Sequence, residues 1–74
     1  RDVEAEGALA KALSLEPQNL DFLYALADFY IKRARYSLAE QLAEKMIAAH
    51  PSQRIGHELL EAARSLRRKQ LAPQ

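Results

Sequence analysis

The residues His57-Glu58-Leu59-Leu60-Glu61 begin like His-Glu-x-x-His, the motif with which metalloproteases hold zinc. The second histidine is replaced by Glu61, which shares a helix face with His57. A catalytic zinc needs three protein ligands and an open coordination position. The only other histidine, His50, stands just before the break at Pro51. We interpret these residues as a solvated helix face and predict no metal site.

Acid–base and nucleophilic catalysis have no better candidates. The carboxylate pairs Glu40/Glu44 and Glu58/Glu61 lie on charged faces, and nothing around them suggests a dry pocket suited to proton transfer. The chain has no glycine-rich loop for a phosphate group. No serine has a neighbouring base in a recognised pattern: Ser14, Ser37, Ser52 and Ser65. The sequence therefore predicts no enzyme and no cofactor.

The strongest charge feature is a basic run near the C-terminus. From Arg54 onward the net charge is +3, from five cations and two carboxylates: Arg54, Arg64, Arg67, Arg68 and Lys69 against Glu58 and Glu61. Cations near the end of a helix complement its dipole, which explains most of the run. The alternative is a small helical domain that docks on nucleic acid or anionic membrane through this helix. Few contacts would make such binding weak and salt-sensitive, so nucleic acid is the less favoured partner.

The composition indicates one small helical domain. The chain has 74 residues and no cysteine, so helix packing or a partner must stabilise it without disulfides or thiolate zinc sites. It is rich in Ala, Leu, Glu, Lys and Arg, with two Gly and three Pro, which favours helix over strand. The formal net charge of +1 gives no overall reason to expect nucleic acid. No apolar run approaches the roughly 18 residues of a membrane span, so we predict no transmembrane segment.

The start of the chain carries no targeting information. It opens with Arg1 rather than Met, and no signal peptide is visible. This opening suggests a fragment or a processed form. Missing targeting signals therefore decide nothing about location, and cytoplasmic and periplasmic settings are both allowed.

Apolar spacing and helix breakers predict the first two helices. The first covers Asp2 to Leu15, with Asp2 as its cap, and stops because Pro17 disfavours helical geometry at the residue before it. The second covers Leu20 to Arg33, with Asn19 as its cap. More than one neighbour must cover this second helix, because it carries two apolar stripes: Leu23, Leu26, Ala27, Tyr30 and Ala34, and beside them Phe22, Leu26 and Phe29.

The short break Ala34-Arg35-Tyr36 forces a third helix to fold back antiparallel. Ser37 opens it, and Ser37 and Glu40 have the Ser-x-x-Glu spacing of a capping box. It ends before Pro51 and directs six apolar residues inward: Leu38, Ala39, Leu42, Ala43, Met46 and Ile47. A fourth helix from about Gln53 to Gln70 has one apolar stripe, so one side of it is covered: Ile55, Leu59, Ala62, Ala63, Leu66 and Leu71. Residues 72–74 are a frayed tail.

The chain repeats itself with a period of 34 residues, the distance between Pro17 and Pro51. The helices that these prolines close look alike at the same offset: Ala5, Leu9, Ala12 and Leu13 align with Ala39, Ala43, Met46 and Ile47. A period in this range is typical of helical solenoids.

The period and the residues resemble the tetratricopeptide repeat family. Its pattern Trp-x-x-Leu-Gly-x-x-Tyr, then Ala-x-x-x-Phe, then Pro, falls on these residues: Leu23, Leu26, Ala27 and Tyr30, then Ala39 and Ala43, then Pro51. Leu26, Tyr30, Ala39 and Pro51 match outright, and Ala27 keeps a small residue where paired helices approach closely. Ala43 departs from the aromatic of the family, and Phe22 or Phe29 is the expected filler of that space.

The resemblance implies an all-α fold, a right-handed superhelix of antiparallel helix-turn-helix units with about four helices. Residues 1–17 look like the second helix of a partial repeat, 18–51 like one full repeat and 52–71 like a C-terminal capping helix. The last helix keeps Leu60 but has Glu61 and Arg64 where the family has a small residue and Tyr. Polar residues there suit a helix on which no further helix packs.

The same resemblance implies a protein-interaction module that binds a protein or peptide. In the family, one side of the first helix of a repeat lines a concave groove, which here would show five residues: Asp21, Tyr24, Asp28, Lys32 and, from the next helix, Glu58. The carboxylate-clamp version of the family uses Lys, Asn and Arg there, so the charge here has the wrong sign for that clamp. A merely solvated face is the alternative interpretation.

The first helix lacks the partner that would precede it in a repeat. Part of its apolar surface should therefore be bare, around Ala5, Ala8, Ala12 and Leu15. We expect this surface to pair with a copy of itself about a two-fold axis, giving a homodimer of the isolated chain. In a longer parent protein it would meet an upstream repeat instead.

Overall fold

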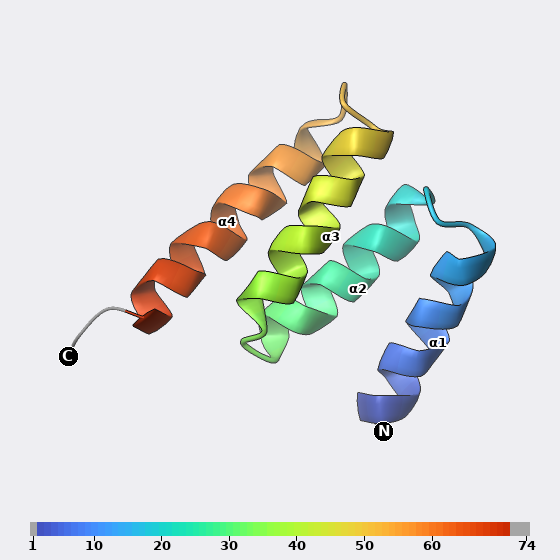
Figure 1. Cartoon of the computed structure of the whole chain (residues 1–74), viewed down its shortest axis with the longest axis horizontal. Coiled ribbons are helices and arrows are strands. Elements are labelled where there is room, and N and C mark those ends of the chain that lie inside the picture. The colour runs from blue at the N-terminus through green and yellow to red at the C-terminus, as the bar shows by residue number, and fades with distance from the viewer. Residues whose placement is uncertain (1, 72–74) are drawn as a thin grey trace.

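The computed structural model describes residues 2–71, which form four helices and no strand (Figure 1). The helices are α1 (Asp2–Leu15), α2 (Leu20–Lys32), α3 (Tyr36–Ala49) and α4 (Arg54–Leu71). The prediction of an all-α fold is confirmed, and the predicted bounds differ by at most one residue. The side chain of Asp2, proposed as a cap, and the tail 72–74 lie outside the described residues.

Each helix runs antiparallel to the one before it, and the molecule is a thin slab. The Cα atoms span 42 × 34 × 12 Å. In Figure 1 the order across the slab is α4, α3, α2, α1, so α3 lies between α2 and α4 while α1 lies at the edge beside α2. The packing of α3 on α4 and on α2 is extensive, whereas α1 packs on α2 over a smaller area.

The core lies where α2, α3 and α4 meet. Its buried cluster draws three residues from α2, three from α3 and one from α4: Leu23, Leu26, Ala27, Leu42, Ala43, Met46 and Leu59. From α1 only the half-buried Leu9 and Leu13 pack against it. Phe29 packs against the cluster that holds Ala43, and Phe22 is half-buried outside it. That either ring fills the space at Ala43 stays a prediction. No polar side chain among the described residues is buried.

The turn between α2 and α3 corrects one predicted core residue. Ala34 was expected on the inward stripe of the second helix, but it is exposed in the turn with a left-handed φ of 60°. The turn closes α2 with two backbone bonds, from Ala34 N–H to the Ile31 carbonyl and from Arg35 N–H to the Tyr30 carbonyl. This is the Schellman pattern, whose left-handed residue is usually glycine because a Cβ is strained there.

The helix caps were predicted with mixed success. Asn19 caps α2 as expected, since its Oδ1 accepts a hydrogen bond of 3.1 Å from Phe22 N–H. The capping box at Ser37 and Glu40 is wrong: α3 begins at Tyr36, its cap residue is Arg35, and no side chain bonds the cap. The Glu40 carboxylate instead accepts a hydrogen bond of 2.5 Å from Nε of Arg67 on α4. Glu40 therefore bonds a cation of the neighbouring helix, and its side chain does not bond the backbone N–H at the start of α3.

A glycine lets α3 and α4 approach closely. Gly56 is buried, and a Cβ at this position would lie 3.1 Å from Met46 Cβ and 3.2 Å from Ile47 N. Fewer residues of the apolar stripe predicted on α4 are buried than expected. Leu59 and Ala63 are buried, but Ala62 and Leu71 are exposed, Leu71 to 71%. The buried side of α4 combines two small residues, Gly56 and Ala63, with Leu59 between them.

Candidate partner-binding surface

Four of the five predicted groove residues follow one exposed side of α2. Asp21, Tyr24 and Lys32 are exposed and Asp28 is half-buried, as their spacing of three and four residues predicts for one helix side. Asp28 and Lys32 form an ion pair of 3.0 Å. Tyr24 is 41% exposed and forms no hydrogen bond through its hydroxyl within residues 2–71. That these residues bind a partner stays a prediction.

An open hollow of about 230 Å³ joins the first turns of α2 and α4, which lie at the same end of the molecule (Figure 1). Its lining combines two predicted groove residues with two aliphatic ones: Asp21, Tyr24, Leu20 and Ile55. The fifth predicted residue, Glu58, does not line this hollow. It lies one turn further along α4, where its carboxylate is 4.0 Å from Arg54 Nε.

Leu20 and Ile55 were not predicted to belong to this surface. Ile55 was assigned to the inward stripe of α4; it is half-buried and both packs against the core and lines the hollow. A signal for it existed in the repeat, because Ile55 stands 34 residues after Asp21. The same repeat position therefore carries an acid on α2 and an aliphatic side chain on α4, and the two meet across the hollow.

Charge at the hollow comes from one carboxylate. Asp21 is the only charged residue in the lining, and it forms no ion pair with any other described residue. The carboxylates further along this face already have cations near them, Asp28 at 3.0 Å and Glu58 at 4.0 Å. The unpaired negative charge of this face is therefore concentrated beside Tyr24.

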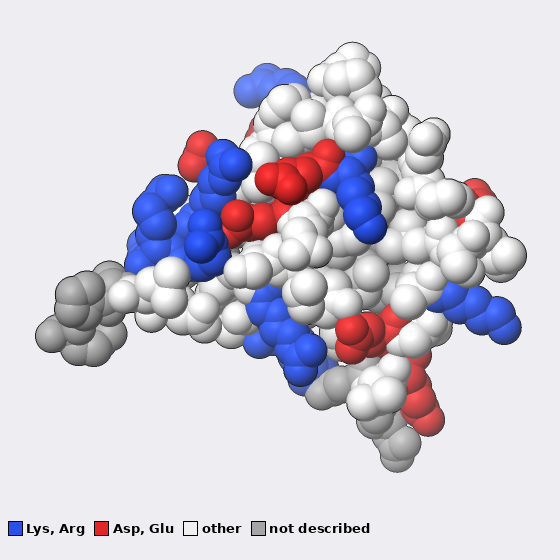
Figure 2. All heavy atoms as spheres, viewed as in Figure 1, with Lys and Arg blue, Asp and Glu red and all other residues white. Residues whose placement is uncertain are grey.

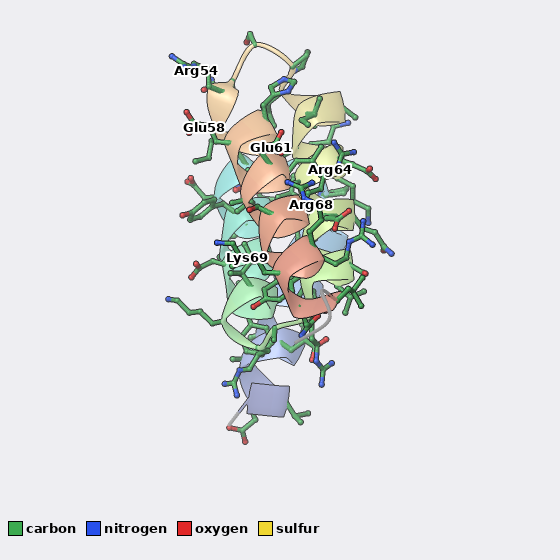
Figure 3. The ribbon with its side chains drawn as sticks, turned by 90° about the vertical axis from the view of Figure 1, so that its left-hand side faces the viewer. Arg54, Glu58, Glu61, Arg64, Arg68 and Lys69 are labelled. Carbon is green, nitrogen blue, oxygen red and sulfur yellow. The ribbon has the colours of Figure 1, made fainter. Side chains whose placement is uncertain are left out.

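The basic end of α4 is partly neutralised. Figure 2 shows the Lys and Arg side chains of this end gathered at the left, with acidic side chains directly beside them. Arg67 bonds Glu40, and Arg68 lies 4.0 Å from Glu61. Figure 3 shows charged side chains along the whole outer side of α4. At about 100° per residue, Arg64, Arg67 and Arg68 share one side of α4, whereas Lys69 points well away from Arg64.

The predicted self-association surface on α1 is largely bare. Ala5, Ala8 and Leu15 are exposed, Leu15 to 75%, and only Ala12 is half-buried. On its other side α1 is held to α2 by the Tyr30 hydroxyl, which donates a 2.6 Å hydrogen bond to Oε2 of Glu6. This bond, then burial and the charge of Glu6, raise the pKa of the Tyr30 phenol. Whether the bare side pairs with another copy stays a prediction.

The residues considered for metal binding line neither the hollow nor the bare side of α1. His57 and Glu61 are both exposed, and residues 2–71 contain no group of three or more side chains placed to hold a metal ion. The other histidine, His50, directs its ring Nε2 to the Gln18 carbonyl at 2.5 Å, and so ties the end of α3 to the turn before α2. No helix within the described residues is long and apolar enough to cross a membrane.

The comparison with known families agrees with the architecture. A family model for the tetratricopeptide repeat matches residues 3–63, which cover α1, α2, α3 and the first half of α4. No curated protein and no solved structure matches the chain. The matched segment carries the repeated helix pairs and the small residues at which they approach. The chain belongs to the tetratricopeptide repeat family.

Proposed function

We propose that the chain binds a protein or peptide partner on the face formed by α2 and the first turns of α4. Tetratricopeptide repeats are generally protein–protein interaction modules and typically non-catalytic. The observation that carries the proposal is the hollow, which is lined by an exposed aromatic ring, Tyr24, together with two aliphatic side chains and an unpaired carboxylate. Tyr is enriched in protein interfaces because it combines a large apolar ring with a polar end.

The size of the hollow supports a macromolecular partner. At about 230 Å³ it is smaller than the roughly 300–1,000 Å³ of typical small-molecule sites, so it suits one or two side chains of a partner. Further contacts would come from the continuing face of α2, where Asp28 and Lys32 are exposed or half-exposed. Tyr24 would then be the anchor and the charged residues would form a polar rim.

The test compares partners captured by matched variants of the full chain. Wild type, Tyr24→Ala and Gln41→Ala would be immobilised and exposed to an extract of the source cells; Gln41 is an exposed residue of α3. We expect a protein that wild type and Gln41→Ala retain and Tyr24→Ala loses. Equal retention by all three variants would contradict the proposed face.

Salt dependence separates this proposal from docking of α4 on nucleic acid or anionic membrane. Binding through Tyr24 should change little with salt. Binding that falls steeply with log salt, and that Arg64→Ala weakens while Tyr24→Ala does not, would instead favour the basic end of α4.

A further inference from the structure

We infer that the hollow between α2 and α4 selects a basic side chain of the partner, an arginine or a lysine. The inference rests on the proposed function, since it names the chemistry of the partner at the same face. It starts from the lining, which has an aliphatic part, an aromatic ring and one acid: Leu20, Ile55, Tyr24 and Asp21.

The aliphatic part of the lining suits the stem of a long basic side chain. Leu20 and Ile55 are half-buried and supply apolar surface to the hollow, one from α2 and one from α4. Lys and Arg commonly lay their methylene stems along such surface and keep the charged group in water. An acidic side chain has a shorter stem and would bring its charge to Asp21.

The charged end of such a side chain has two attractive groups. Asp21 is exposed, forms no ion pair among the described residues, and would accept hydrogen bonds from a guanidinium or an ammonium. The face of the Tyr24 ring attracts cations through its quadrupole. Lys32 and Arg54 lie within 4.0 Å of Asp28 and Glu58, and neither forms an ion pair with Asp21.

The first turn of α2 gives Asp21 a structural role as well. An acid there complements the helix dipole whether or not a ligand binds. This role explains the charge but not its surroundings, because the dipole requires neither the exposed ring of Tyr24 nor the hollow that opens toward α4. The combination, rather than the acid alone, points to a cationic ligand.

The experiment is an NMR titration of the full 15N-labelled chain. The probe is N-acetyl-arginine amide; N-acetyl-citrulline amide, which has nearly the same shape without the charge, and N-acetyl-glutamate amide are the controls. We expect the arginine probe to shift amides of residues 20–24 and 54–56 saturably in the millimolar range. The citrulline and glutamate compounds should shift them weakly or not at all.

Variants assign the contacts. Asp21→Asn should weaken binding of the arginine probe about twofold to fivefold, the range of an exposed ion pair. Tyr24→Leu, which keeps an apolar side chain, should weaken it by a similar factor through the lost cation–π contact. Glu44→Gln is the matched control, because it removes an exposed carboxylate of α3 that does not line the hollow, and it should leave the affinity unchanged. The amide spectra report whether each variant is folded.

Two results would overturn the inference. Equal shifts with arginine and citrulline compounds would show that the charge is not recognised, and stronger shifts with the glutamate compound would reverse the sign of the ligand. Either result leaves the α2–α4 face available to a partner of other chemistry. The proposed function itself fails only if Tyr24→Ala retains every captured protein.

Discussion

The two ends of the slab contain the same kind of helix junction, built with different tightness. α1 packs on α2 as α3 packs on α4, and the two junctions are related by the 34-residue period. At the second junction Gly56 is buried and α3 has several fully buried residues. At the first, the position 34 residues earlier is Phe22, and none of residues 3–15 of α1 is buried. The α1–α2 junction therefore has a bulky phenylalanine where the α3–α4 junction has a glycine, and its packing is less extensive.

The number of neighbours also differs between the junctions. α3 is covered from two sides, by α2 and α4, whereas within the described residues the main packing of α1 is on α2. Residues of one repeat pattern therefore have different burial: Ala12 of α1 is half-buried, and Met46, its counterpart on α3, is completely buried. Position in the array, and not the pattern itself, determines how much each helix contributes to stability.

The largest predicted effect compares one core residue from each junction. Met46→Ala should cost about 2–5 kcal/mol of unfolding free energy, because the side chain is fully buried and leaves a cavity. Leu9→Ala on α1 should cost only about 1 kcal/mol, because that side chain is half-buried. Urea denaturation of both variants measures the difference. Equal costs would show that the junctions are equally tight.

The two glycines should respond with opposite signs. Gly56→Ala should destabilise by about 1–2 kcal/mol, because the new methyl group meets Met46 and the backbone of Ile47. Gly7→Ala on α1 meets nothing within 4 Å and should stabilise by about 0.5–1 kcal/mol through helix propensity. Thermal unfolding of the pair tests this. A stabilising Gly56→Ala would mean that α4 moves away from α3 at little cost.

At the α3–α4 junction, removing the bond between Glu40 and Arg67 should cost more stability than removing the side chain of Ser37. Glu40→Ala should cost about 1 kcal/mol through loss of the partly buried bond to Arg67. Ser37→Ala should change stability by less than about 0.5 kcal/mol, because its side chain caps nothing. A double-mutant cycle of Glu40 with Arg67 should show coupling, and one of Glu40 with Ser37 should be additive. Coupling of Glu40 with Ser37, and additivity of Glu40 with Arg67, would instead support the capping box.

The polar contact of the loose junction should be weaker and alkali-sensitive. Tyr30→Phe should cost about 0.5–1 kcal/mol by removing the bond to Glu6. Because folding raises the pKa of the Tyr30 phenol, this contribution is fully present below the ordinary pKa near 10.0 and is lost as pH rises through the folded-state value. The stability difference between wild type and Tyr30→Phe should therefore shrink above pH 10. A difference that grows there would refute this sign.

The smallest effect on folding is predicted for the bare side of α1. Ala8→Glu should leave the stability of the chain within about 0.5 kcal/mol, because Ala8 is exposed. If α1 pairs with a copy of itself, the same change should abolish the dimer that light scattering detects at high micromolar concentration. A chain that is monomeric throughout the concentration series, with or without Ala8→Glu, would contradict self-association.

The sequence by itself determined the local architecture. Four helices, their bounds to within one residue, the Asn19 cap and the buried stripe at Leu23, Leu26 and Ala27 all follow from short-range patterns. Such patterns are reliable because helical periodicity, caps and breakers act within a few residues. The exposed side of α2 that carries Tyr24 follows from the same periodicity.

Only the tertiary structure decided which residues meet across helices. Glu40 had a plausible partner N–H three residues away, yet it bonds Arg67, which lies 27 residues further along the chain. Ile55 was expected to face inward, yet it also lines the hollow with Asp21 and Tyr24. The physical reason is that these contacts depend on how closely the helices approach and how each is rotated about its axis. Side chains at the interfaces, such as Gly56, set that approach, and residue spacing along one helix does not specify it.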